Sequence, residues 1–151
     1  MKKLIVIAGL VTLIGVGLDI SHNLTSDHEH NATVDNSCVT VYVDYSTGPK
    51  TSQCIDVNGT VTGPQIVSEA GYDIEGTQKY PTEIVCRVNN FPGPDLEKCV
   101  DMPPADAYWA ILVYKNNRWD WATTGISEIT LQAGEGIGLV YADNGEVSFP
   151  K

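Results

Sequence analysis

Histidine is missing from most of this chain: the only three, His22, His28 and His30, lie near the N-terminus. No Gly-x-Ser-x-Gly motif occurs either. A Ser-His-Asp triad therefore cannot be assembled from the residues after His30. Acidic pairs such as Asp101 with Asp106 are present, but acids in loops are typically solvated side chains rather than a catalytic dyad. We predict that the protein is not an enzyme.

Basic residues are also scarce. The chain has 9 Lys and Arg against 19 Asp and Glu, which gives a formal net charge of −10. A polyanion is repelled by nucleic acid and by anionic membrane surfaces. Nucleic-acid binding is therefore excluded, and the charge itself indicates only a solvated acidic surface.

The N-terminus has the pattern of an export signal. Lys2 and Lys3 precede an uncharged apolar run from Leu4 to Leu18, which is short for a membrane helix, since a span needs roughly 20 residues. No cysteine follows the run, which argues against a lipoprotein anchor. We interpret residues 1–18 as a signal peptide, with an uncleaved membrane anchor as the alternative. The protein is then secreted or held at the cell surface.

Residues 19–37 are polar and show no apolar period, so they are predicted to form a flexible tether. The His28-Glu-His30 motif within them is of a kind that holds zinc or copper loosely, but we read it as part of a solvated tether and predict no metal site. The remaining residues, 38–151, are enough for one domain with a single core.

Four cysteines, Cys38, Cys54, Cys86 and Cys99, indicate a disulfide framework in an exported chain. Three pairings can be drawn. We favour the sequential one, Cys38–Cys54 and Cys86–Cys99, because each bond closes a short loop that contains turn residues. Zinc binding is the competing interpretation, and the absence of a C-x2-C pair argues against it.

Apolar periodicity predicts several strands and one helix. Alternation over 39–44 is typical of a half-buried strand, and Thr62 to Gly71 has the cap, early proline and terminal glycine of a short helix. Asn116-Asn117 is a hairpin turn. These signals predict a compact α+β domain whose mainly antiparallel or mixed sheet is covered on one face by the helix. The other predicted strands span 53–57, 83–88, 107–114, 118–122 and 137–141.

The hairpin formed by 107–114 and 118–122 carries most of the candidate binding residues. Trp119 and Trp121 are two residues apart and so point to one face, with the strand of Tyr108 and Trp109 opposite. Such aromatic side chains form a stacking platform for a flat ligand or a sugar. We favour the alternative for the group as a whole, namely that these side chains pack the core or cover the hairpin.

The second half resembles a known family. The segments Val85-Cys86-Arg-Val-Asn-Asn-Phe-Pro92 and Cys99-Val-Asp-Met-Pro-Pro-Ala-Asp-Ala-Tyr-Trp109, with Gly125-Ile-Ser127 and Ala133-Gly-Glu135, are similar to the transcobalamin-like C-terminal domain family, in particular its small secreted actinobacterial members. The resemblance covers about residues 39–142. It implies a β-grasp-like fold, places a ligand contact at Trp109, and implies a corrinoid or another small ligand.

The function expected from these features is that of an exported, non-catalytic module that binds a small ligand or an envelope protein. It needs no cofactor of its own, although a cobalamin-type ligand is among the candidates. The alternative is a secreted protease inhibitor of the small two-disulfide type, whose rigid bait loop would be Phe91 to Lys98, between Cys86 and Cys99.

Overall fold

The computed structural model describes residues 34–151. The predicted signal peptide, 1–18, and residues 19–33 of the predicted tether, with their three histidines, lie outside the described residues. Within the described part, no helix is long and apolar enough to cross a bilayer.

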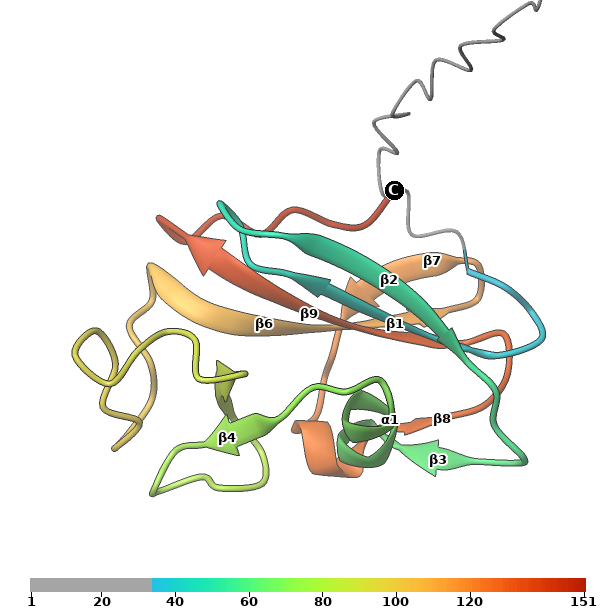
Figure 1. The fold of residues 1–151 in the computed structure, drawn as a ribbon, viewed down its shortest axis with the longest axis horizontal. Helices are drawn as coiled ribbons and strands as arrows, with labels where there is room; N and C mark the ends of the chain where they lie inside the picture. Colours follow the sequence, from blue (N-terminus) through green and yellow to red (C-terminus); the bar gives the residue numbers. More distant parts are fainter. Residues whose placement is uncertain (1–33) are drawn as a thin grey trace, which may run out of the picture.

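A five-stranded mixed sheet forms the main layer (Figure 1). The strand order is β2-β1-β9-β6-β7. The first and last strands of residues 34–151, β1 and β9, run parallel, and every other neighbouring pair is antiparallel. The predicted mixed sheet is therefore confirmed. Its strands are β1 (Val39–Asp44), β2 (Lys50–Ile55), β6 (Ala107–Lys115), β7 (Arg118–Trp121) and β9 (Gly136–Asp143).

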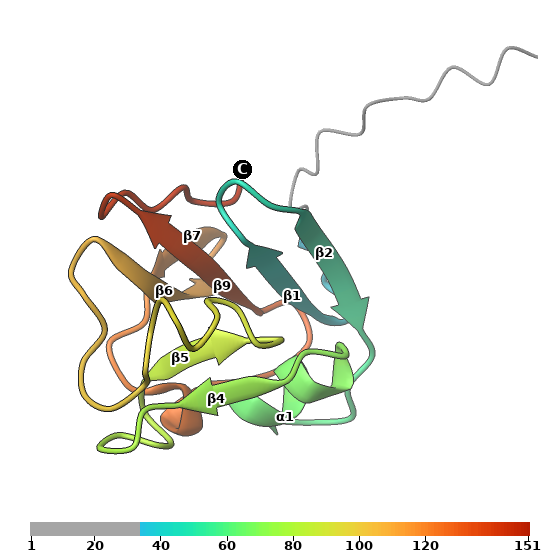
Figure 2. The same ribbon diagram turned by 60° about the vertical axis from the view of Figure 1, so that its left-hand side comes forward.

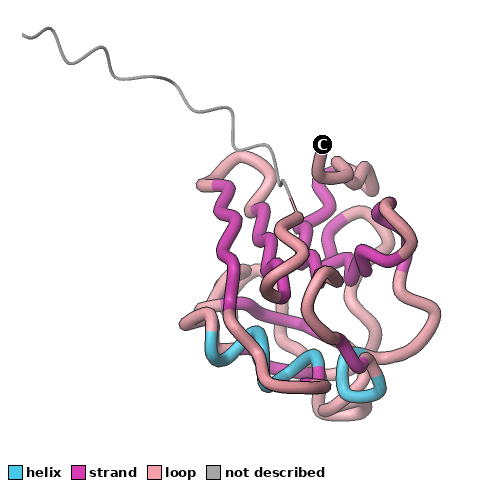
Figure 3. Tube along the Cα trace, turned by 90° about the vertical axis from the view of Figure 1, so that its right-hand side faces the viewer, coloured by secondary structure: helices cyan, strands magenta, loops and turns pink. Residues whose placement is uncertain are grey.

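The helix and the short strands lie together on one side of this sheet, as Figures 1 and 2 show. Figure 3 shows the strands of the sheet standing above the helical segments. The small strands pair with each other, β3 with β8 and β4 with β5, and both pairs are antiparallel. These elements are β3 (Val61–Thr62), α1 (Gly63–Glu69), β4 (Ile74–Gly76), β5 (Val85–Val88), a 3₁₀ turn (Ile126–Glu128) and β8 (Thr130–Leu131).

Helix α1 forms where the sequence predicts it. Thr62 is the N-cap, and its backbone N–H donates to Gln65 Oε1 at 3.2 Å. At the other end Gly71 adopts a φ of +85°, in the left-handed region that glycine enters without steric cost. Its N–H donates to the Ser68 carbonyl at 2.9 Å. Because the helix has only 7 residues, the burial of Ile66 and Val67 must hold it in place.

The core lies between α1 and the inner face of the sheet. It joins alternate residues of β1 and β9 to the helix, and each fully buried aliphatic side chain contributes about 1.5–3 kcal/mol. Strand β1 was predicted to be half-buried, and this is wrong, because all 6 of its residues are buried. The reason is that β1 lies inside the sheet, and its even-numbered residues are covered by a second apolar cluster on the outer side. This cluster includes Tyr42, Ala110, Leu112 and Val140, and Trp119 packs against it.

Both predicted disulfides are present. Cys38–Cys54 links β2 to the residue before β1, with a Cα–Cα distance of 5.5 Å. Cys86–Cys99 links β5 to the loop before β6, with a Cα–Cα distance of 5.7 Å. Two disulfides are typical of proteins that fold outside the reducing cytosol.

Candidate ligand-binding site

The sheet separates the four aromatic residues that the sequence singled out. Trp119 lies opposite Tyr114 and Trp121 opposite Leu112, so both tryptophans share the outer face with the even-numbered residues of β6, including Tyr108. Trp109 points to the inner face and joins the core. The expectation that Trp119 and Trp121 share a face is confirmed, but the four rings do not form one platform.

Trp109 is held rigidly on the inner face. Only 4% of its surface is exposed, and its indole N–H donates to the Phe91 carbonyl at 2.9 Å. The rings of Tyr45 and Tyr141 meet it edge-on, with centroids 5.1 and 5.4 Å away. Such edge-to-face pairs stabilise a fixed ring position, so Trp109 presents a stationary wall to anything beside it.

The two tryptophans of β7 differ in what they can do. Trp119 packs against Tyr114 at a centroid distance of 5.4 Å and covers Gly136 and Gly138, which makes it a packing residue. Trp121 is 45% exposed and meets the ring of Phe149 at 5.7 Å. Trp121 is therefore the tryptophan of this hairpin that is free to contact a partner.

Tyr108 and Trp109 meet at a pocket on the sheet edge. Strand β7 pairs only with Leu112–Lys115, so it leaves Ala107–Ala110 unpaired on that side. Tyr108 and Trp109 lie on opposite faces of β6, and both line the pocket. The pocket has a volume of about 360 Å³, at the lower end of the range of small-molecule sites. No charged side chain lines it. The lining residues are Ile84, Met102, Pro103, Pro104, Ala105, Tyr108 and Trp109.

The loop that forms the outer wall of this pocket is anchored to residues 78 and 79. Backbone N–H groups of Gln78 and Lys79 donate to the carbonyls of Cys99 and Val100 at 2.7 and 3.2 Å. Lys79 Nζ also lies 2.9 Å from Asp101 Oδ2. This hydrogen bond lowers the pKa of the Asp101 carboxyl and raises the pKa of Lys79. With two prolines following, the wall has few conformations to lose on binding.

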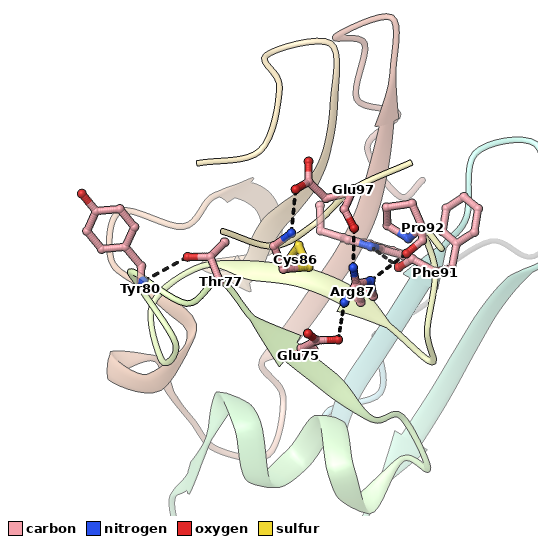
Figure 4. The surroundings of a disulfide bond; sticks show 10 residues. Glu75, Thr77, Tyr80, Cys86, Arg87, Phe91, Pro92 and Glu97 are labelled. Atoms are coloured by element: carbon pink, nitrogen blue, oxygen red, sulfur yellow. Dashed lines mark hydrogen bonds and ion pairs between the residues drawn. A yellow bond between two sulfur atoms is a disulfide. The ribbon is translucent and has the colours of Figure 1, made fainter. Parts of the chain in front are cut away.

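A buried arginine braces the neighbouring loop. Arg87 is 8% exposed, its Nε donates to the Pro92 carbonyl at 2.9 Å, and its guanidinium also donates to the Glu97 carbonyl (Figure 4). A third bond, of 2.6 Å, runs to Glu75 Oε2. Arginine suits this role because its planar group offers five donors in a fixed geometry. Sequence reasoning gave Arg87 no function, since nothing in the pattern shows that its partners are backbone carbonyls.

The groups weighed as metal ligands have other partners. Within residues 34–151 the cluster with suitable spacing is Cys86, Glu97 and Cys99, but the two cysteines are bonded to each other and supply no thiolate. Asp101, named above as an acid of a possible catalytic pair, forms the ion pair with Lys79. His22, His28 and His30 lie outside the described residues.

Comparison with protein-family models, with curated proteins and with solved structures finds no match to this chain. The similarity to the transcobalamin-like C-terminal family thus stays a prediction from the segments around Cys86 and Trp109.

Proposed function

We propose that this protein is an exported, non-catalytic binding module and that its ligand occupies the pocket beside Tyr108 and Trp109. The observation that supports the proposal is the convergence, on one apolar pocket of about 360 Å³, of two aromatic residues singled out from the sequence and a rigid Pro103-Pro104 wall. Because the pocket is apolar and already formed, a ligand pays little ordering entropy there.

The lining favours an uncharged, flat ligand. A buried charge would find no counter-ion among the lining residues, so it would lose its hydration without compensation. Proline and aromatic side chains contact planar rings well. A corrinoid, the ligand that the family resemblance implies, is larger than this pocket, so it would insert only an edge of its ring system or a substituent.

The proposal includes a β-grasp-like fold and membership of the transcobalamin-like family. The supporting feature is the topology: an antiparallel hairpin of β1 and β2, then α1 packed on the sheet, and a last strand, β9, that runs parallel to β1 and beside β6. The two disulfides support secretion or a cell-surface location.

The direct test is a titration followed by amide chemical shifts of the ¹⁵N-labelled protein, with both disulfides intact. The probes are indole, as a neutral flat ring, and a panel of corrinoids. We expect Tyr108→Ala to weaken binding about tenfold, the loss of one aromatic contact. Tyr114→Ala is the matched control, because Tyr114 lies on the same strand and the same face but outside the pocket. Equal affinities of the two variants, or no saturable binding of any probe, would remove the pocket as the site.

A second candidate function is protease inhibition through the loop that Arg87 braces. Leu96 in this loop is 79% exposed, the largest value among the exposed large apolar residues of 34–151. One observation argues against this function. The N–H groups of Leu96 and Glu97 both donate to the Gly93 carbonyl, so this part of the loop is a closed turn. A protease cleft that binds its inhibitor as an added strand needs an extended segment instead. The test is an assay of subtilisin inhibition. If the protein inhibits subtilisin and Leu96→Gly does not, protease inhibition replaces ligand binding as the proposed function.

A further inference from the structure

A second cavity lies next to the proposed ligand pocket. It has a volume of about 220 Å³ and lies between the start of α1, the strand pair β4–β5 and the 3₁₀ turn. Its lining residues are Pro64, Ile74, Glu75, Gly76, Pro81, Thr82, Ile84, Val85, Ile126 and Ser127. Ile84, which is half-buried, is the one residue that lines both cavities.

The walls of the second cavity are fixed by backbone contacts. Gly76 lies so close to Pro81 that a Cβ on Gly76 would come within 2.2 Å of the Pro81 carbonyl oxygen. On the opposite side the Ser127 N–H donates to the Thr82 carbonyl at 3.2 Å, which ties the 3₁₀ turn to this segment. The cavity is therefore a built feature of the fold.

The two cavities differ in chemistry. The first offers apolar and aromatic surface, whereas the lining of the second also includes Thr82 and Ser127, which carry hydroxyl groups. The Thr82 hydroxyl donates its proton to Glu83 Oε1 at 2.9 Å, so its oxygen is left as an acceptor. Hydroxyl oxygens accept hydrogen bonds, and the Thr82 hydroxyl has already donated its proton, so this end favours a ligand group that donates them.

We infer that the two cavities form one binding site, divided by Ile84, for a ligand that joins a flat apolar ring to a tail ending in a hydrogen-bond donor such as a hydroxyl. This inference rests on the proposed function, because the ring occupies the pocket beside Tyr108. It adds the class of ligand and makes Ile84 the residue that sets the length of the linker between ring and donor.

The test compares indole with a series of 3-(ω-hydroxyalkyl)indoles of increasing chain length, using amide chemical shifts of the ¹⁵N-labelled protein. Indole is expected to shift the amides of Ala105 and Tyr108 only. Longer members are expected to shift those of Gly76 and Ser127 as well. If every member shifts only the first pair, the two-part site is wrong and the proposed function stands. If indole itself does not shift the first pair, the proposed function fails.

Variants then separate the roles of the divider and the donor partner. In Ile84→Ala a shorter chain is expected to reach Ser127, and Ile55→Ala is the matched control, because Ile55 is half-buried but lines neither cavity. Ile84→Val repeats the comparison with less loss of packing if the alanine variant does not fold. Ser127→Ala is expected to weaken the long hydroxyalkyl member about fivefold and to leave indole unchanged. An unchanged chain-length threshold in both Ile84 variants would overturn the role of Ile84.

Discussion

The indole ring of Trp119 lies over Gly136: a Cβ on that glycine would come within 3.1 Å of Trp119 Cη2. It would also lie 3.0 Å from the carbonyl oxygen of Thr40 on the parallel neighbour β1. The glycine therefore lets a large ring close over the middle of the sheet. This contact explains why the outer face of β1 is buried although neither helical segment of residues 34–151 covers it.

Gly136→Ala is expected to destabilise the protein by about 1–3 kcal/mol, because the added methyl group overpacks a site bounded partly by backbone. Urea unfolding followed by Trp fluorescence measures the change. Gly93→Ala is the control, since a Cβ there meets nothing within 4 Å, and it is expected to be neutral or to stabilise the protein by up to about 1 kcal/mol. A Gly136→Ala variant as stable as wild type would show that Trp119 does not pack tightly on the sheet.

Arg87→Lys is expected to lower the free energy of unfolding by about 2–3 kcal/mol. A single ammonium group cannot reach the carbonyls of Pro92 and Glu97 and the Glu75 carboxylate together, so at least one buried acceptor loses its partner. Glu75→Gln is the control, because this half-exposed partner contributes less than about 1 kcal/mol. Equal effects of the two substitutions would mean that the ion pair, and not the carbonyl bracing, is what Arg87 provides.

The two disulfides are expected to differ in their reduction. Cys54 is exposed on the edge strand β2, whereas Cys86 and Cys99 are each only 2% exposed. Thiol–disulfide exchange requires access of the attacking thiolate to a sulfur, so a mild thiol reductant is expected to open Cys38–Cys54 first. Alkylation of the released thiols followed by mass spectrometry identifies the order. Prior release of Cys86 and Cys99 would indicate that the loop around them opens readily.

Local signals in the sequence predicted several elements correctly. Helix α1 has a cap, an early proline and a terminal glycine within ten residues, and the β6–β7 turn is an Asn-Asn pair with φ values of 54° and 61°. The sequential disulfides followed from short loops. In each case the residues that determine the structure are close together in the chain, so their pattern is sufficient.

Features that depend on distant residues were not predicted. Strands β3, β4 and β8 have only two or three residues, too few to show a period. The pocket combines Ile84, the 102–105 loop and the start of β6, and only the last of these was singled out for binding. Trp109 and Trp119 look alike in sequence, and only the sheet shows that one faces the core and the other the outer side.

Tyr42 makes the stability of the protein sensitive to alkali. Burial, and then the charge of the neighbouring Asp44 carboxylate, raise the pKa of the Tyr42 phenol to about 12, compared with 10.0 for a free tyrosine. Between these two values the folded state keeps a proton that the unfolded state has lost, so stability falls as pH rises from about 10 to about 12. In Tyr42→Phe this contribution is absent, and the fall over that window is expected to be shallower. Unfolding midpoints in urea at pH 8, 10 and 11 for both proteins measure the difference, with pH 8 as the reference below the window. Parallel curves for the two proteins would show that the Tyr42 phenol ionises at its ordinary pKa, and hence that neither burial nor the Asp44 carboxylate raises that pKa.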